Sequence, residues 1–560
     1  MTDVPNPIEI ARRAVQDEMT RGDFAQAERM LAEAQARHPK SVGLKVLMGQ
    51  ILAHAAPETG ADHILAVMRD MPPGPPRHHA ADQLAATITQ YPLPLAAATS
   101  FALRLTAADL EQRELNPVVS ALTDALPDAD RLAFLQAVAP KSGLFRLEWK
   151  LAVAETEAGH PDAALTVLET ARAAGRCNAQ STMLEADLLD TVERPDAAIA
   201  LLDQAIATEP DRPDYWRRLI SQLDRAVDID RAVALISQAL TRWPEDWMLV
   251  YRLNRIKAPQ AALLAMQDLI RPAAESAAQD DRYRFQYALA CLNVGDLSRA
   301  RSLLADPFIS AVSHMADAVR DALAVHDDNF WRQGNQSVAD RTSDLMVAKV
   351  PCARATVIVT SGVFFGYMPM QMIDAFLAPL GVNRVYLRDF NKRAYCRGIQ
   401  SLGPDEPTSL AALAALLDDL GPRRRITIGS SLGGYGALRI GARLGVEAAV
   451  SLSGPSDPRL SYADLRPSIW NTAWFAKLVL DRDPSLMTDL VPILSAPQSA
   501  ATRILQYYPA GNASDCGQAL RLDGLPRVSL RPLEGVGHHV VANRMMADGS
   551  LAALLDDLLA

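Results

Sequence analysis

A spacing of about 34 residues recurs along the first half of the chain and limits its fold more than any other feature. The segments PDAALTVLETA, PDAAIALLDQA and IDRAVALISQA align at this step, which places Ala164, Ala198 and Ala232 in equivalent positions. Two of the segments reach a proline at the same offset, at Pro210 and Pro244. A small residue at a crossing lets two helices approach closely, and a proline ends the second helix. The spacing therefore predicts pairs of helices stacked one after another.

The same step occurs nearer the start of the chain. Ala27, Ala34 and Pro39 lie at the repeat offsets, and Ala61 and Pro73 follow one full step after Ala27 and Pro39. A helix–turn–helix unit of this length, with small residues at these offsets, resembles the tetratricopeptide repeat. The resemblance implies an all-α helical-repeat solenoid over residues 8–325, regular at 145–250 and less regular at 80–145 and after 250.

A solenoid of this kind usually offers its concave face to another protein. We therefore expect a protein partner on the repeats. The alternative is that the helices only pack against the rest of the chain and stabilise it.

Composition and charge narrow the class of protein. A chain of 560 residues, 49% hydrophobic and 22% charged, suits a globular protein of roughly two to four domains. The net charge is −10, and residues 351–560 are almost neutral, with 20 Lys and Arg against 18 Asp and Glu. An acidic first part and a neutral second part lack the basic surface that binds nucleic acid or anionic membranes.

The compartment is predicted from what the sequence lacks. The first ten residues have neither the basic start nor the apolar core of a secretory signal. No uninterrupted apolar run of about 18 residues is present, so no membrane span is predicted. The five cysteines are scattered without paired spacing, which argues against a disulfide framework and against a zinc site. We expect a cytoplasmic protein.

After about residue 326 the helical periodicity stops, and short apolar runs alternate with helical stretches. Strands are predicted for DLMVAKV, ATVIVTSG, RVYLRDF, RRITIG, EAAVSLSG, RILQYY and RVSLRPL, and a helix closes the chain. This alternation predicts a mostly parallel sheet covered by helices on both faces. We expect a linker and first strand at 326–349 and an α/β domain over 350–560.

One motif in this region carries chemistry. The pattern G-x-S-x-G occurs at 429–433, between a predicted strand and a predicted helix, which is the context of a nucleophile elbow. Gly429 and Gly433 flank a serine whose strained backbone leaves no room for a Cβ on its neighbours. Gly434 and Gly436 are expected to let the next helix pack closely. The pattern predicts Ser431 as a nucleophile at a helix N-terminus, and a glycine-rich turn without chemistry is the alternative.

A serine nucleophile needs a base. His538 and His539 are the only histidines between residues 350 and 560, and both follow the last predicted strand. We predict His538 as the base and His539 as a neighbour that lines the pocket. The opposite assignment stays open.

The acid must orient the histidine and stabilise its charged form. Asp515 follows RILQYY and precedes a helix, which makes it the first choice. Asp457, after the preceding strand, ranks second, and Asp523 ranks third. A loop aspartate is often only a turn residue or a helix cap.

The oxyanion hole needs two backbone donors. Leu432, directly after the nucleophile, is predicted to supply one. The second is predicted from Gly362 or Val363 in TSGVFFG, with Val363 preferred.

Together these motifs make residues 350–560 similar to the α/β-hydrolase superfamily, with Ser431, Asp515 and His538 in its order of nucleophile, acid and base. The resemblance implies a serine hydrolase that cleaves an ester or thioester through a covalent acyl-enzyme and needs no metal or organic cofactor. VYLRDFNKRAYCRGI and GSSLGGYGAL are also similar to bacterial hydrolase domains beside glycan-handling and protein-export systems. Two alternatives remain: an acyltransferase that acylates a glycan or another alcohol, and a repeat scaffold with an inactive hydrolase domain.

Two further predictions concern the surroundings of the site. Residues 458–500, with Trp470 and Trp474, are expected to form a short lid. Arg388 and Asp389 are expected at the rim of the pocket, where they either bind a polar substrate or form a surface ion pair.

Overall fold

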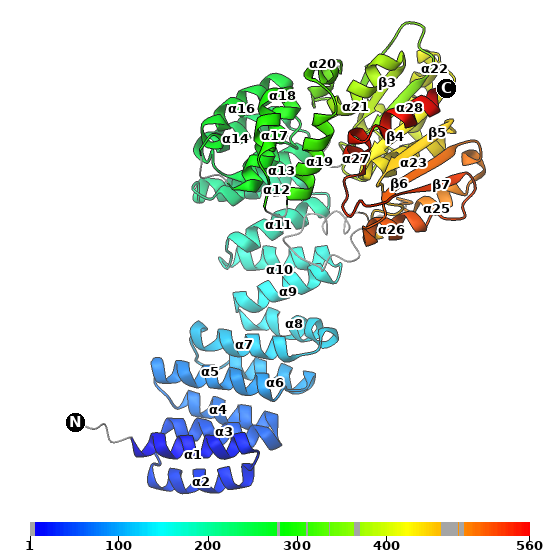
Figure 1. The fold of residues 1–560 in the computed structure, drawn as a ribbon. Helices are drawn as coiled ribbons and strands as arrows, with labels where there is room; N and C mark the ends of the chain where they lie inside the picture. Colours follow the sequence, from blue (N-terminus) through cyan, green and yellow to red (C-terminus); the bar gives the residue numbers. More distant parts are fainter. Residues whose placement is uncertain are drawn as a thin grey trace. The chain divides into compact units, whose positions relative to one another are not determined.

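The computed structural model describes residues 6–276, 280–309, 312–334, 336–362, 370–460, 480 and 486–560. The chain divides into two compact units, Met1–Leu188 and Leu189–Ala560. The first unit is helical throughout its described part, and the second joins further helices to a β-sheet (Figure 1).

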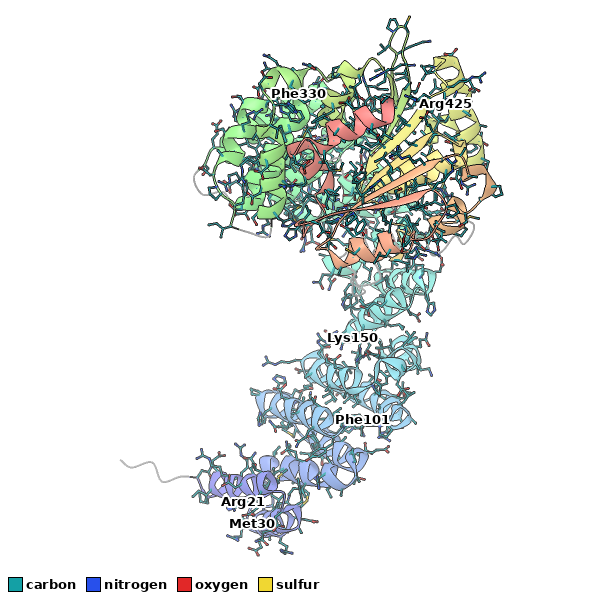
Figure 2. All side chains as sticks on the ribbon, turned by 45° about the vertical axis from the view of Figure 1, so that its right-hand side comes forward. Arg21, Met30, Phe101, Lys150, Phe330 and Arg425 are labelled. Atoms are coloured by element: carbon teal, nitrogen blue, oxygen red, sulfur yellow. The ribbon has the colours of Figure 1, made fainter. Side chains whose placement is uncertain are left out.

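The helices of the first unit follow one another through short connections. Their bounds are α1 Pro7–Arg21, α2 Phe24–Arg37, α3 Val42–Ala55, α4 Pro57–Arg69, α5 Pro75–Gln90, α6 Leu95–Thr106, α7 Gln112–Ala125, α8 Asp128–Ser142, α9 Phe145–Glu157, α10 Pro161–Ala173 and α11 Ala179–Thr191, which crosses into the second unit. One apolar core runs from α3 to α9 and includes the fully buried Phe101, labelled in Figure 2.

The second unit begins with helices that continue the same series. They are α12 Pro195–Thr208, α13 Pro213–Arg225, α14 Ile229–Arg242, α15 Trp247–Leu253, α16 Gln260–Ala274, α17 Asp281–Val294, α18 Leu297–Ala305, α19 Ser313–Ala324 and α20 Asp328–Arg332.

The repeat step of the sequence is the step of these helices. Helices α9, α11, α13 and α15 begin at residues 145, 179, 213 and 247, and α10, α12 and α14 begin at 161, 195 and 229. Ala164, Ala198 and Ala232 are completely buried at equivalent places in α10, α12 and α14. The predicted helical-repeat architecture is confirmed, and α5–α8 show that it also covers the stretch where the sequence pattern is weak.

The rest of the second unit alternates strands and helices. Its strands are β1 Leu345–Ala348, β2 Thr356–Thr360, β3 Asn383–Leu387, β4 Arg425–Ser430, β5 Ala448–Leu452, β6 Arg503–Pro509 and β7 Val528–Leu533. Its helices are α21 Met370–Leu377, α22 Glu406–Leu420, α23 Leu432–Leu444, α25 Leu490–Leu494, α26 Ala513–Leu520, α27 Val541–Ala547 and α28 Ser550–Leu559.

The strands form a single seven-stranded sheet in the order β1-β3-β2-β4-β5-β6-β7. Strand β1 pairs with β3 in antiparallel fashion, and every other pair is parallel. Strand β3 lies between β1 and β2, and beyond β2 the strands follow one another in chain order from β4 to β7. An open, mostly parallel sheet with a serine elbow after a central strand is the α/β-hydrolase fold, as the sequence predicts.

Helices cover both faces of this sheet. On one face, α22, α23 and α25 share apolar cores with the strands through Ile358, Val385, Ala449 and Ile504. On the other face lie α21, α27 and α28 (Figure 1). Strands β2, β3 and β5 are buried along their whole length, as expected for inner strands of a sheet covered on both faces.

The helices before the sheet are bonded to it within the second unit. The rings of Phe330 and Trp331 in α20 pack edge-on against Phe376 in α21, with centroids 5.0 and 5.8 Å apart. Arg341 is buried and donates from Nη1 to the backbone oxygen of Asn254 at 2.8 Å. The boundary between the compact units, directly after Leu188, therefore lies well before the predicted start of the α/β domain at 350.

Within the described residues, no helix is both long and apolar enough to cross a bilayer.

Candidate active site

Ser431 lies at the turn between β4 and α23. Its backbone has φ 57° and ψ −130°, a region that costs a non-glycine residue about 1–3 kcal/mol. Its amide donates to Leu452 O at 2.9 Å, and Gly434 N donates to Ser431 O at 2.8 Å. The turn is thus fixed on one side by β5 and on the other by the first turn of α23. This geometry is that of a nucleophile elbow.

The glycines around Ser431 are required by close packing. A Cβ on Gly433 would lie 2.3 Å from Thr360 O, and a Cβ on Gly429 would lie 2.3 Å from Gly433 O. Both distances are far inside van der Waals contact, so no other residue fits without a shift of the backbone. The Thr360 hydroxyl donates to Gly433 O at 2.6 Å and ties the elbow to β2.

Two further glycines have different neighbours. A Cβ on Gly434 would meet Ser451 Oγ of β5 at 2.5 Å, as expected for close packing on the sheet. A Cβ on Gly436 would instead meet the ring of Tyr395 at 2.5 Å. Gly436 therefore makes room for the loop that follows β3.

One of the two predicted oxyanion donors, Leu432, lies at the elbow itself. Leu432 is the first residue of α23, and an amide at that position has no acceptor inside the helix. Val363 lies outside the described residues. Gly362, the other candidate, is next to the elbow, because its nitrogen would be 2.9 Å from a Cβ on Gly433.

Asp515 and His539 are paired. Asp515 lies in the first turn of α26, after β6, and His539 lies between β7 and α27. His539 Nδ1 is 2.9 Å from Asp515 Oδ2 and 3.1 Å from Oδ1. A carboxylate on Nδ1 holds the ring so that Nε2 is free to act as a base.

His538, the histidine preferred from the sequence, has another neighbour. Its ring stacks on that of His314 in α19, with centroids 4.0 Å apart and planes 24° from parallel. The structure thus pairs Asp515 with His539 and not with His538. Consecutive loop residues point their side chains in different directions, and the sequence does not encode which of the two faces Asp515.

The other two candidate acids lie elsewhere. Asp457 is buried and bonded to Arg459, with Nη2 at 2.8 Å from Oδ2. Burial alone would raise the pKa of Asp457, but the hydrogen bonds from Arg459 outweigh it and lower that pKa. Asp523 is exposed in the turn after α26. Among the described residues, neither is bonded to a histidine.

Ser431 and the Asp515–His539 pair come from the same edge of the sheet. Ser431 follows β4, Asp515 follows β6 and His539 follows β7, and these strands are parallel. Parallel strands present their carboxyl ends at one edge, where ligands of α/β proteins bind. Within the described part of the chain, no hydrogen bond joins the Ser431 hydroxyl to either histidine.

Of the two residues predicted at the rim of the pocket, Arg388 is buried instead. Arg388 is only 1% exposed, and its guanidinium donates to Ser343 O and Val338 O, each at 2.7 Å. Burial lowers the pKa of Arg388 to about 10. Asp389 accepts a hydrogen bond from Tyr395 N at 3.1 Å. The expectation of a substrate-binding or surface pair is therefore wrong for Arg388, which ties β3 to the segment before β1.

Tyr395 is a residue of the site that the sequence analysis missed. Its ring is buried, and its hydroxyl is 2.7 Å from Ser361 O and 3.1 Å from Leu387 O. Ser361 directly precedes Gly362. The hydroxyl thus fixes the backbone of the segment from which the second oxyanion donor is expected. An aromatic residue in a loop carries no sequence signal for this role.

The predicted lid lies mostly outside the described residues. Trp470 and Trp474 are both among the residues that the structure does not describe.

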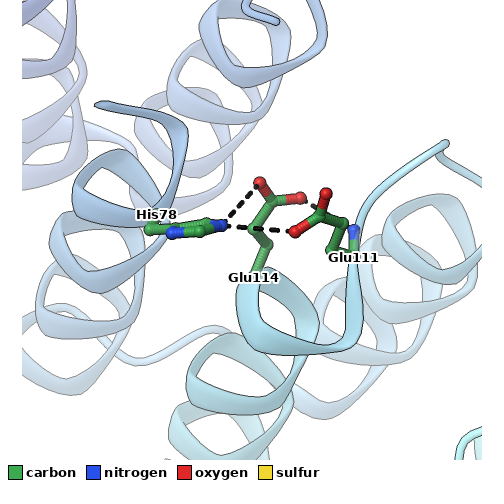
Figure 3. A group of neighbouring side chains, drawn as sticks. All are labelled: His78, Glu111 and Glu114. Atoms are coloured by element: carbon green, nitrogen blue, oxygen red, sulfur yellow. Dashed lines mark hydrogen bonds and ion pairs between the residues drawn. The ribbon is translucent and has the colours of Figure 1, made fainter. Parts of the chain in front are cut away.

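A group of possible metal ligands lies in the first unit, away from these residues in the sequence. His78, Glu111 and Glu114 offer ligand atoms within 4.8 Å of one another (Figure 3). Both oxygens of Glu114 are already bonded, Oε1 to Arg77 Nε at 2.6 Å and Oε2 to Glu111 N at 2.8 Å. The positive charge of Arg77 beside the Glu114 carboxylate would repel a metal cation. The group is therefore a helix cap with a buried ion pair.

No protein-family model matches the sequence, and the search of curated proteins found no relative. Solved structures do match. The bottromycin epimerase BotH in complex with bottromycin A2 is 16% identical, with a TM-score of 0.26, over 39% of this chain and 94% of its own. A carboxylesterase structure from the thaumarchaeon Nitrososphaera gargenis is 13% identical, with a TM-score of 0.27, over 38% of this chain and 94% of its own.

Another matched structure covers more of the chain. The structure of Naa15/Naa10 bound to HypK-THB is 12% identical, with a TM-score of 0.28, over 79% of this chain and 66% of the other. Esterases are prominent among the matches to the sheet domain. An epimerase is also among the matched structures, so these similarities do not identify a reaction.

Proposed function

We propose that this chain is a serine hydrolase that cleaves an ester or thioester. Ser431 is the nucleophile, His539 the general base and Asp515 the carboxylate that orients the base. The observation that carries the proposal is the 2.9 Å contact between His539 Nδ1 and Asp515 Oδ2, at the sheet edge where Ser431 occupies a strained elbow. His539 replaces His538, the choice made from the sequence.

The mechanism follows from these positions. His539 Nε2 takes the proton of the Ser431 hydroxyl as its oxygen attacks the acyl carbon, and Asp515 stabilises the imidazolium. The Leu432 amide and an amide of the segment after β2 bind the oxyanion. The imidazolium then protonates the departing alkoxide or thiolate. Water, deprotonated by His539, attacks the acyl-enzyme, releases the carboxylic acid and restores the serine.

The first experiment is covalent labelling of the full-length protein with a fluorophosphonate, which reacts only with an activated serine. Ser431→Ala should abolish labelling. Ser430→Ala is the matched control, because Ser430 is the adjacent hydroxyl and should leave labelling intact. Absence of labelling in folded wild-type protein would contradict the proposal and favour the inactive scaffold.

The same assay assigns the base. His539→Ala should slow labelling by about 10²–10⁴-fold, the usual contribution of a general base. His538→Ala should cause a smaller loss. A larger loss for His538→Ala would return the role to the residue preferred from the sequence.

We also propose that the repeats of the first unit bind a protein partner. Support comes from a groove of about 220 Å³ between α1, α3 and α5. Its lining includes the buried apolar side chains of Val46 and Leu47 and the polar side chains of Arg12, Gln50 and His79. A partner captured on the full chain and then purified should lose binding to Gln50→Lys but not to Glu33→Lys, a change at an exposed residue of α2. Equal binding to both variants would exclude this groove.

A further inference from the structure

Helix α19 precedes the sheet domain in sequence yet reaches the candidate active site. It lies beside α27, the helix that directly follows His538 and His539 (Figure 1). The His314 ring of α19 stacks on the His538 ring with centroids 4.0 Å apart. A residue from the helical segment therefore touches the neighbour of the proposed general base.

Within the described part of the chain, the loop that carries the proposed base has few other anchors besides its close packing on Gly511. Residues 537–539 are exposed, so burial does not fix their orientation. The backbone of this loop accepts a bond at Val536 O from Gly511 N at 3.0 Å, and Val540 N donates to His538 O at 2.8 Å. Beyond these, the loop's side chains are held by the Asp515 contact of His539 and the His314 contact of His538. Exposed loops with so few contacts sample several conformations.

We propose that His314 is a positioning residue for catalysis, which holds His538 by ring stacking and thereby places His539 toward Ser431. The inference rests on the proposed function. An error of about 1 Å in the placement of a catalytic group costs up to about 10²-fold in rate, so a modest anchor of this loop has a measurable effect.

The protonation state of His314 suits a stacking role. Burial and the neighbouring His538 lower the pKa of His314, while Asp317, one turn further along α19, acts in the opposite direction. The lowered pKa favours the neutral form of the His314 ring. A neutral ring stacks on His538 without a charge beside it.

The proposed active site therefore extends beyond the sheet domain. The sheet domain supplies Ser431, Asp515 and His539, but the support of the base comes from a helix that precedes every strand of the sheet in the chain. The active site then depends on the helical segment for its geometry, and not only for a binding partner.

The test uses the full chain and hydrolysis of p-nitrophenyl acetate. His314→Ala should lower kcat by about 10- to 100-fold with KM within about twofold, since substrate contacts are unchanged. His314→Phe, which keeps the stacked ring, should restore most of kcat. Ser313→Ala, on the same helix, is the control and should behave as wild type.

A double substitution separates positioning from general stability. If His314 acts through His538, the His314→Ala, His538→Ala pair should lose no more kcat than the more damaging single change. Additive losses would overturn the inference. If His314→Ala does not fold, His314→Leu takes its place, because it fills the space without a ring.

The outcomes for the two proposals are distinct. Wild-type protein that is not labelled by a fluorophosphonate overturns the proposed function and this inference together. Labelled wild-type protein whose His314→Ala variant keeps full kcat overturns the inference alone.

Discussion

Asp515 and Asp457, two carboxylates of the sheet domain, have different hydrogen-bond partners. Asp515 offers both oxygens to His539 Nδ1, at 2.9 and 3.1 Å. Asp457 instead accepts from Arg459 N, Nε and Nη2, and is 2% exposed. A triad carboxylate must hold the imidazole in one tautomer, and only the first arrangement does so.

Substitution of each carboxylate by its amide separates these roles. Asp515→Asn should lower kcat for an ester substrate by roughly 10⁴-fold, because the amide favours the wrong histidine tautomer. Asp457→Asn should leave kcat within a few-fold but lower the free energy of unfolding by about 1–3 kcal/mol, through the loss of a buried charge-assisted bond. Steady-state kinetics and urea unfolding of both variants measure this. A large loss of kcat for Asp457→Asn alone would reverse the assignment.

The residues of the site were predictable to different degrees. Ser431 could be proposed from the sequence because a glycine-bracketed serine between a strand and a helix is the pattern that a nucleophile elbow requires. Asp515 could be proposed because it follows β6. His538 and His539 were not separable, since the torsion angles of one exposed loop decide which ring faces the acid. Tyr395 gave no signal at all.

At the scale of elements, the loop between β3 and α22 braces the site. Tyr395 packs on Gly436 of α23 and bonds to Ser361 O, so one side chain links the nucleophile helix to the segment after β2. Burial raises the pKa of Tyr395, which keeps the hydroxyl protonated and able to donate.

Tyr395→Phe tests this brace. The change removes the donor to Ser361 O and leaves a carbonyl without its partner, at a cost of about 1–3 kcal/mol. We expect kcat to fall by about tenfold with a smaller change in KM, because the oxyanion donor shifts while substrate contacts remain. Tyr283→Phe, also a buried tyrosine but on α17, is the matched control. Equal kcat for wild type and Tyr395→Phe would show that Ser361 is held by other means.

Element type was predictable because the strands of the sheet are short and largely apolar segments between turn residues. The burial of Arg388 was not. A charged residue after a strand most often lies at the surface, and the burial of Arg388 is made tolerable by the backbone oxygens of Ser343 and Val338 and by the nearby charges of Asp340 and Asp344.

At the scale of the whole molecule, the repeat step could be predicted wherever alanines recur at the helix crossings. It could not be predicted at 80–145, where helices are present but these alanines do not recur at the same spacing. The extent of the second unit could not be predicted. It depends on contacts distant in sequence, such as the ion pair between Lys392 Nζ and Asp224 Oδ2, 2.7 Å apart and 168 residues apart in the chain.

That ion pair makes the stability of the second unit depend on pH in the acidic range. Burial alone would raise the pKa of Asp224, but the charges of Lys392 and Lys257 outweigh it and lower the pKa from 3.8 to about 2. Since the pKa is lower in the folded state, the pair contributes stability above about pH 4. This contribution, about 2 kcal/mol, is lost as the pH falls from about 4 toward 2.

Asp224→Asn should therefore lower the free energy of unfolding at pH 7, and its difference from wild type should shrink as the pH approaches 2. Urea unfolding at pH 7, 4 and 3, followed on the transition that Asp224→Asn shifts, measures this difference. Asp203→Asn, a change at an exposed ion pair with Arg231, is the control and should stay within about 1 kcal/mol of wild type at each pH. A gap between wild type and Asp224→Asn that is constant with pH would show that packing, and not the carboxylate charge, joins α13 to the loop after β3.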